Sequence, residues 1–144
     1  MSSQDWLKKS KFFAYLTPPV GVNVREREQD FIWMTDDNIL CSVPIDNVKV
    51  LTIEESNVQL KEFQDEFGTE KIRMVSVINP NAKSTKEIRD WAADILPEII
   101  DKIGIISDSP LGRMAIKLFI GLRPPTYGIK VFKTAEDAFA WIRE

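Results

Sequence analysis

KIRMVSVI, residues 71–78, is the stretch that decides the fold. Its second half is almost entirely apolar, which is typical of a strand that is covered on both faces. A helix is predicted on each side of it, over 52–67 and over 84–96, from apolar residues at helical spacing. A central strand flanked by helices predicts an α/β fold with crossovers between parallel strands.

The two flanking helices carry recognisable start and stop signals. Thr52 with Glu55, and Ser84 with Glu87, form capping-box pairs in which each side chain satisfies a backbone N–H of the first turn. Pro97 is expected to kink or split the second helix, because proline lacks the N–H that the helix needs.

Further strands and helices are predicted on both sides of this centre. β-branched and aromatic residues favour strands that form a β-hairpin before residue 44. The predicted strands are 20–27, 30–34, 38–43, 103–106 and 129–132, and the further helices are one starting at 107–110 and one over 134–143. The sequence thus predicts a mixed, mainly parallel sheet with an N-terminal β-hairpin and about four helices.

The composition limits what the chain can be. Its 144 residues, 44% of them hydrophobic, fit one domain with a real core. A formal charge of −3 gives no basic excess for nucleic acid. No run approaches the roughly 20 apolar residues of a membrane span, and no signal-peptide pattern is present, so we expect a cytoplasmic protein with little affinity for membranes.

The chemistry open to the chain is also limited. It contains no histidine, which excludes Ser-His, Cys-His and His-metal sites. The lone Cys41 stands in an apolar run and is expected to fill the core. We therefore expect neither an enzyme nor a bound cofactor or metal.

The N-terminal segment, residues 1–21, is interpreted as an appendage. It mixes aromatic residues with three lysines and ends at Pro18 and Pro19, which cannot continue a helix. Such a segment can contact a membrane or a partner, but packing on its own sheet or on a second copy is the favoured interpretation.

Three C-terminal runs carry a family resemblance: IGIISDSPLGR at 103–113, FIGLRPP at 119–125 and VFKTAEDAFAWI at 131–142. They resemble a bacterial family of small uncharacterised proteins described as STAS-like or SpoIIAA-like. The resemblance extends more weakly to 31–40 and 52–55. The resemblance implies one STAS-like domain over residues 22–144.

The resemblance implies a fold like that of the anti-sigma-factor antagonists and the cytoplasmic domains of sulfate transporters, which dock to partners and are not enzymes. In the antagonists a phosphorylatable serine stands in an Asp-Ser-Ser-Gly motif after the central strand. Here that place holds Lys83-Ser84-Thr85-Lys86, which lacks the aspartate and the glycine and puts Lys86 at the phosphorylated position.

Two helix starts are the first candidate sites. Ser84, Thr85 and Lys86 form a candidate anion or phosphorylation site, because the N-terminus of a helix favours negative charge. Asp108 and Ser109, with Arg113 one turn later, form a candidate docking or anion site. The alternative is structural in both cases: the hydroxyls cap helices and the cations are solvated. In a STAS-like sheet both starts lie at the same end.

A third candidate is the mouth of a pocket. Arg123 and Tyr127 would flank a cavity between the sheet edge and the helix around Leu111–Leu122. The leading hypothesis is a non-enzymatic interaction domain that docks to an unknown protein partner or to a second copy as a homodimer. The alternative is a carrier or sensor of a small apolar or anionic metabolite.

Overall fold

The computed structural model describes residues 5–47, 50–80, 85–110, 112–114, 116 and 125–144. Two short 3-10 helices open the chain, and strands and helices alternate after an initial run of three strands. The elements are η1 (Asp5–Lys9), η2 (Lys11–Ala14), β1 (Arg25–Glu26), β2 (Asp30–Met34), β3 (Ile39–Pro44), α1 (Ile53–Phe67), β4 (Ile72–Val77), α2 (Lys86–Ile99), β5 (Ile100–Ile106), β6 (Gly128–Phe132) and α4 (Ala135–Ile142). Between β5 and β6, Pro110, 112–114 and 116 are helical.

The described strands form one sheet in the order β1-β2-β3-β4-β5-β6. β1 and β2 pair antiparallel, as do β2 and β3, while β3, β4, β5 and β6 run parallel to one another. The β2–β3 turn places Asn38 in the left-handed region at a φ of 63°, which asparagine tolerates better than most residues. The predicted mixed, mainly parallel sheet with an N-terminal hairpin is confirmed.

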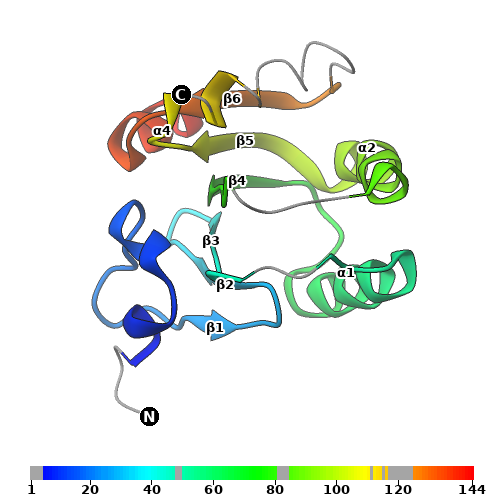
Figure 1. The fold of residues 1–144 in the computed structure, drawn as a ribbon, viewed down its shortest axis with the longest axis horizontal. Helices are drawn as coiled ribbons and strands as arrows, with labels where there is room; N and C mark the ends of the chain where they lie inside the picture. The colour runs from blue at the N-terminus through cyan, green and yellow to red at the C-terminus, as the bar shows by residue number, and fades with distance from the viewer. Residues whose placement is uncertain (1–4, 48–49, 81–84, 111, 115, 117–124) are drawn as a thin grey trace.

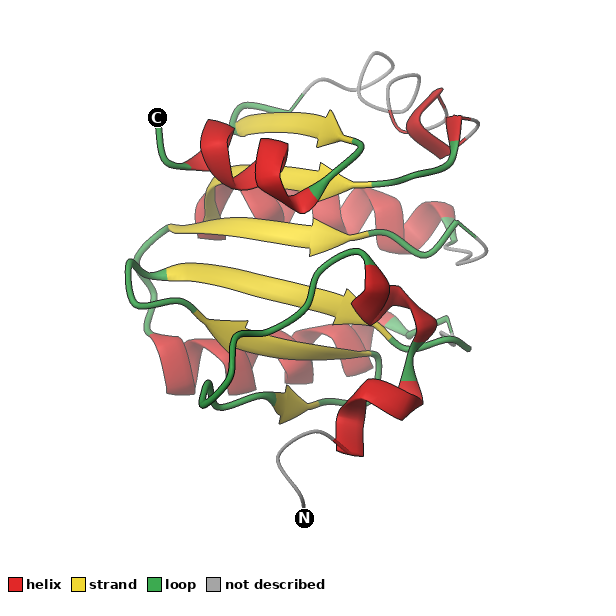
Figure 2. Cartoon of the chain, turned by 90° about the vertical axis from the view of Figure 1, so that its left-hand side faces the viewer, coloured by secondary structure: helices red, strands yellow, loops and turns green. Residues whose placement is uncertain are grey.

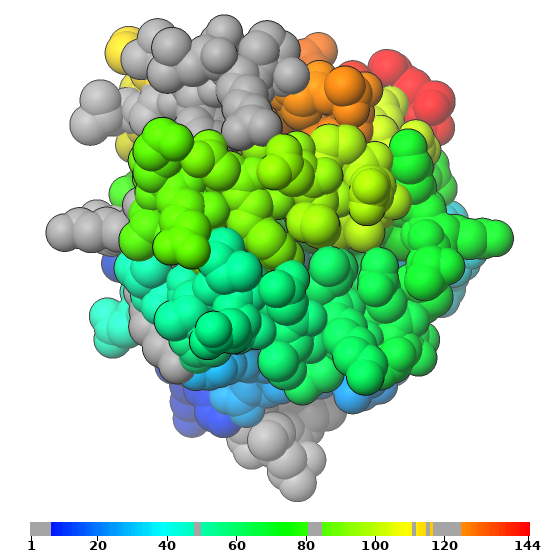
Figure 3. Space-filling model, turned by 90° about the vertical axis from the view of Figure 1, so that its right-hand side faces the viewer, coloured from blue at the N-terminus to red at the C-terminus, as the bar shows by residue number. Residues whose placement is uncertain are grey.

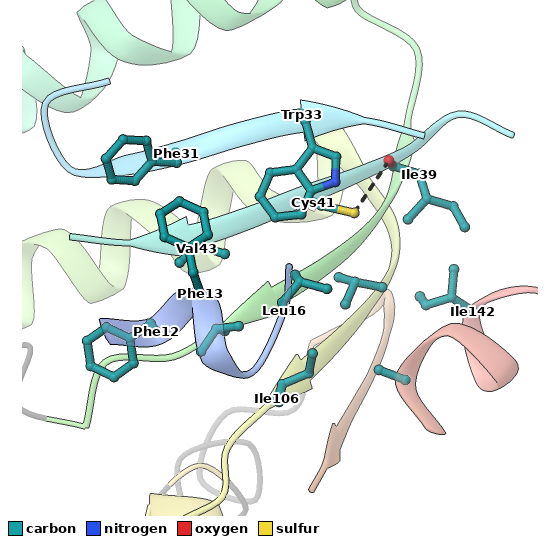
Figure 4. Close-up of a cluster of buried hydrophobic side chains, with 13 residues drawn as sticks. Phe12, Phe13, Leu16, Phe31, Trp33, Ile39, Cys41, Val43, Ile106 and Ile142 are labelled. Carbon is teal, nitrogen blue, oxygen red and sulfur yellow. Dashed lines mark hydrogen bonds between the residues drawn. The ribbon is translucent and has the colours of Figure 1, made fainter. Parts of the chain in front are cut away.

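Helices cover both faces of the sheet (Figure 1). α1 and α2 lie on one face, whereas α4 and the two N-terminal 3-10 helices lie on the other (Figure 2). The main cluster of buried apolar side chains lies between the sheet and this second layer (Figure 4). Its members are Phe12, Phe13, Leu16, Phe31, Trp33, Ile39, Cys41, Val43, Val75, Val77, Ile106, Ala138 and Ile142.

The described part of the N-terminal segment packs on the sheet of its own chain, the first of the two arrangements that the sequence favoured. Phe12, Phe13 and Leu16 are buried, and Figure 4 shows the Phe13 ring beside Phe31 and Val43 of the strands. Ser10 fixes the start of η2, since its hydroxyl accepts from the Phe12 N–H and donates to the Pro44 carbonyl at 2.6 Å. The segment therefore contributes to the core.

The helix predicted over 84–96 differs from the observed one at both ends. Thr85, not Ser84, is the N-cap of α2, and its hydroxyl accepts from the Ile88 N–H at 3.2 Å. The helix also continues through Pro97 and passes directly into β5 at Ile100, three residues before the predicted strand. Pro97 has no N–H to donate to the carbonyl four residues before it, and the loss of this one hydrogen bond does not end the helix.

The other helices begin as predicted. Thr52 and Glu55 form the expected capping box at the start of α1, and Thr134 caps α4 by accepting from the Asp137 N–H. Gly68, with a φ of 88°, follows α1 in a conformation that favours glycine.

Candidate functional site

The candidate site lies where the parallel strands end, here called the carboxyl edge. Because β3, β4, β5 and β6 run parallel, their carboxyl ends meet at one edge of the sheet (Figure 2). Hydrogen bonds continue the pairing beyond the strands, from the Ile78 N–H to the Ile106 carbonyl at 3.1 Å and from the Ser107 N–H to the Phe132 carbonyl at 2.9 Å. In open α/β sheets this is the edge at which ligands bind.

A buried asparagine holds the loops of this edge together. The Asn79 side chain, 5% exposed, donates to the carbonyls of Ile45 and Asp46 at 3.3 and 3.1 Å. The Asp46 carboxylate in turn accepts the backbone N–H of Lys11 at 2.9 Å. The loops after β3 and β4 are thereby fixed to η2.

A pocket of about 250 Å³ opens at the carboxyl edge, below η2. Its apolar lining comes from five residues of η2 and the strand ends: Phe12, Val77, Ile78, Pro80 and Ile106. The polar part consists of Lys11, Tyr15, Ser107 and Asp108. We call this cavity the carboxyl-edge pocket.

Tyr15 and Asp108 close one side of the pocket. The nearby Asp108 carboxylate raises the pKa of Tyr15. The Lys11 ammonium, which also lines the pocket, lies 5.3 Å from the centre of the Phe12 ring, within the range of a cation–π contact. The rim thus presents a carboxylate, a phenol and an ammonium around an apolar floor.

The second predicted site consists of Asp108, Ser109 and Arg113, and two of these residues have structural roles. The Ser109 hydroxyl accepts the Gly112 N–H at 3.1 Å, and the helix begins at Pro110, as the capping interpretation expected. Arg113 donates to the Ser107 carbonyl at 2.8 Å. Asp108 alone of the three predicted residues lines the pocket.

The first predicted site lies at the same edge, because β4 and β5 are parallel neighbours. Ser84 lies outside the described residues. The Thr85 hydroxyl is used in the cap of α2, and the Lys86 ammonium pairs with Asp90 one turn on, at 2.8 Å. Both residues therefore have a local role in the helix.

The third predicted site is separated from the other two. Arg123 lies outside the described residues. Tyr127 precedes Gly128 at the amino end of β6, the opposite edge of the sheet, and burial raises its pKa. The structure does not bring Tyr127 to the carboxyl-edge pocket.

Sequence reasoning missed the contribution of Lys11, Tyr15, Asp46 and Asn79 to this site. Asn79 carried a signal, since it directly follows the central strand, but the others depend on where η2 packs. Among the residues that the structure describes, no cluster of three or more acidic or cysteine side chains could hold a metal ion. None of the described helices is both long enough and apolar enough to cross a bilayer.

Comparison with known proteins places the fold. A family model described as a domain of unknown function (DUF7793) matches residues 32–144. No curated protein matches the sequence. Among solved structures, an uncharacterized protein of the DUF3478 family from Shewanella loihica PV-4, described as having a SpoIIAA-like fold, aligns with a TM-score of 0.51 at 16% identity, covering 84% of this chain and 91% of that one.

A protein of unknown function from Arthrobacter sp. FB24 is also similar at 16% identity, over 78% of this chain and 97% of that chain, but a TM-score of 0.29 supports no argument. The Shewanella structure shows that this chain has a SpoIIAA-like fold, as its C-terminal runs had indicated. At this identity the likeness concerns the fold alone.

Proposed function

The chain belongs to the family described as a domain of unknown function (DUF7793), and we propose that it is a non-enzymatic interaction domain that binds a partner protein through its carboxyl edge. In this proposal the domain acts in the cytoplasm and needs no cofactor. The observation that carries it is the carboxyl-edge pocket, which combines an apolar lining with a polar rim.

The size of the pocket favours a side chain over a metabolite. Pockets for small-molecule ligands usually measure roughly 300–1,000 Å³. The carboxyl-edge pocket has about 250 Å³ and is lined by Phe12, Val77 and Ile106 beside polar groups. Interfaces are commonly dominated by a few anchor side chains that fill such apolar pockets.

The rim is suited to specificity. The Tyr15 hydroxyl lies near the Asp108 carboxylate, which raises the pKa of Tyr15, so the rim offers a phenol and a carboxylate side by side to a partner. Tyrosine is enriched at protein interfaces because its ring is apolar and its hydroxyl is polar. The Asp46–Lys11 bond keeps η2 in place above the pocket, which pre-forms the surface.

The resemblance to STAS-like proteins supports the class of function by analogy. Proteins of that kind act through docking, and the edge used here is the one at which the antagonists carry their regulated serine. Phosphorylation of Ser84 or Thr85 as a control of docking belongs to the proposal, because a phosphoryl group at this helix start would add about −1.5 to −2 charges beside the partner surface.

Photo-cross-linking tests the proposed surface. A photoreactive amino acid is placed at Pro80, which is exposed and lines the pocket, or at Glu70, which is exposed and precedes the other end of β4. The protein is expressed in its own host and irradiated. We expect a discrete adduct with one protein from position 80 and none from position 70.

The captured protein is then purified and its affinity measured by calorimetry. Asp108→Lys is expected to weaken binding roughly tenfold or more, since it reverses a rim charge. Asp101→Lys makes the same change at an exposed position near the opposite end of β5 and is expected to leave the affinity unaltered. Equal effects of the two variants, or equal adducts from positions 70 and 80, would refute the proposal. If no cross-linked adduct forms and the purified protein releases a small molecule on denaturation, the carrier function would be favoured instead.

A further inference from the structure

A second concave surface, unrelated to the carboxyl edge, lies between α1 and the β1–β2 segment. It encloses about 840 Å³. Figure 3 shows α1 between α2 and the light-blue β1–β2 segment on this side of the molecule. Because it is rich in carboxylates, we call it the acidic groove.

The floor of the acidic groove is apolar. Ile32 lies at its base, only 2% exposed, and Val58, Phe63 and Phe67 line it from α1. Val58 is 57% exposed, and the two phenylalanine rings, 4.9 Å apart, are each only partly buried. These apolar side chains retain surface that a partner could cover.

The wall formed by α1 has the periodicity of a helix face. Residues 54 and 55, 58 and 59, 62 and 63, and 66 and 67 all line the groove, at intervals of four along the helix. The groove therefore follows α1 along its length, about 22 Å for a helix of 15 residues. Its opposite wall comes from residues 25–28.

The charge of the acidic groove is one-sided. Its lining includes seven carboxylates, from six glutamates and Asp65, and two arginines, and Lys9 pairs with Glu26 from outside the lining, which leaves an excess of four negative charges. Both arginines are already engaged, Arg25 with Glu66 and Arg27 with Asp30. By contrast, Glu54 and Asp65 take part in no ion pair within the part of the chain that the structure describes.

We propose that the acidic groove binds a basic amphipathic helix of a partner protein. Its apolar side chains would cover Val58, Phe63 and Phe67, and its lysine or arginine side chains would face the rim carboxylates. This is the helix-in-groove mode, in which anchors at i, i+3 or i+4, and i+7 fill an apolar groove.

The dimensions and charge agree with that occupant. A helix about 10 Å across takes up roughly 420 Å³ per 5.4 Å turn, so the groove accommodates the volume of about two turns. Complementary charge raises the association rate and sets the orientation of the partner. An anionic metabolite or an anionic membrane surface would be repelled by the same carboxylates.

The experiment uses a synthetic peptide of about 15 residues, composed of leucine and lysine, with leucines at i, i+3 and i+4 spacing. A scrambled peptide of identical composition keeps the charge and loses the apolar face. Binding to the full chain is followed by fluorescence anisotropy, and the contact site by amide shifts in NMR spectra. We expect saturable binding of the amphipathic peptide, at least about tenfold tighter than that of the scrambled one, with shifts at Val58, Phe63 and Phe67.

Two pairs of matched variants separate specific docking from general attraction. Asp65→Lys lies in the groove, and Glu98→Lys is an exposed change of the same charge on α2, outside it. Val58→Asp introduces a charge on the apolar floor, and Val20→Asp does so at a position 93% exposed elsewhere. We expect several-fold weaker binding for the first member of each pair and no change for the second.

Three outcomes would overturn the inference. The two peptides could bind equally, or Asp65→Lys and Glu98→Lys could weaken binding equally, which would show non-specific attraction. Sedimentation could instead reveal a dimer that Val58→Asp disrupts, which would make a second copy the occupant. The inference does not rest on the carboxyl-edge proposal, since Asp108→Lys should leave peptide binding unchanged.

Discussion

Replacing Phe13 with alanine tests whether the N-terminal segment is part of the folded core. Phe13 is 2% exposed, and its ring centre lies 5.0 Å from that of Phe31 and 6.4 Å from that of Trp33. Removing the ring leaves a cavity between η2 and the sheet and deletes both aromatic contacts. The remaining residues of the segment can close only part of that space.

The expected loss follows from the burial of the ring. Phe→Ala changes in protein cores cost about 3–5 kcal/mol, and partial relaxation of a terminal segment favours the lower end, about 3 kcal/mol. With a urea m-value of about 2 kcal/mol/M for a domain of this size, the midpoint of unfolding falls by about 1.5 M. Val20→Ala, at a side chain 93% exposed, should change the free energy of unfolding by less than about 0.5 kcal/mol.

The assay is equilibrium unfolding in urea, followed by far-UV circular dichroism and tryptophan fluorescence. Coincident transitions justify a two-state free energy. If Phe13→Ala does not fold, Phe13→Leu, with an expected cost of about 1 kcal/mol, gives the same test in a milder form. A loss below about 1 kcal/mol for Phe13→Ala would refute the burial of η2 and return residues 1–21 to the status of an appendage.

Two further predictions concern titratable groups. Hydrogen bonds from Arg143 and from Thr35 lower the pKa of Asp37 to about 2. Because the Asp37–Arg143 pair is about half exposed, Asp37→Asn should lower the free energy of unfolding by about 1 kcal/mol or less at neutral pH. A carboxylate with a depressed pKa stabilises the fold, and this contribution is lost as the pH falls from about 4 to 2. The acid unfolding curves of the variant and the wild type should therefore converge in that range. A difference in stability that does not depend on pH would contradict the assignment. Burial raises the pKa of the Cys41 thiol to about 12. A thiol reagent at pH 8 should therefore modify Cys41 only after urea is added. Rapid labelling of the folded chain would contradict the burial of Cys41.

Hydrophobic patterning predicted most of the fold because the strands and helices obey local rules. Residues 71–78 indicated the central strand, and Thr52 and Thr134 marked helix starts that the structure confirms. Local rules failed around Pro97, where the pattern predicted a break. There the helix passes into β5 without a loop, and Asp101 and Lys102 hid the start of the strand because they made the segment look polar.

The sequence predicted where the candidate site lies but only some of the residues that form it. That the loops after β4 and β5 share an edge follows from parallel pairing, which the alternation of strands and helices implied. Asp108 was foreseen, but Tyr15 was not identified as its partner, because that contact joins segments more than ninety residues apart and depends on the packing of η2. The acidic groove likewise requires α1 to lie beside β1, which periodicity does not specify.

The two faces of the sheet are packed differently, and this difference bears on where a partner can bind. The face covered by η2 and α4 holds the buried cluster, whereas α1 buries Ser56 alone and α2 buries none of its residues. A partner at the carboxyl edge would meet groups held by Asn79 and Asp46, so binding there should change the structure little. A partner along α1 would instead cover half-buried apolar side chains such as Phe63 and Phe67, and would thereby stabilise the less tightly packed layer. Binding at the acidic groove should therefore raise the resistance of α1 to hydrogen exchange more than binding at the carboxyl edge does.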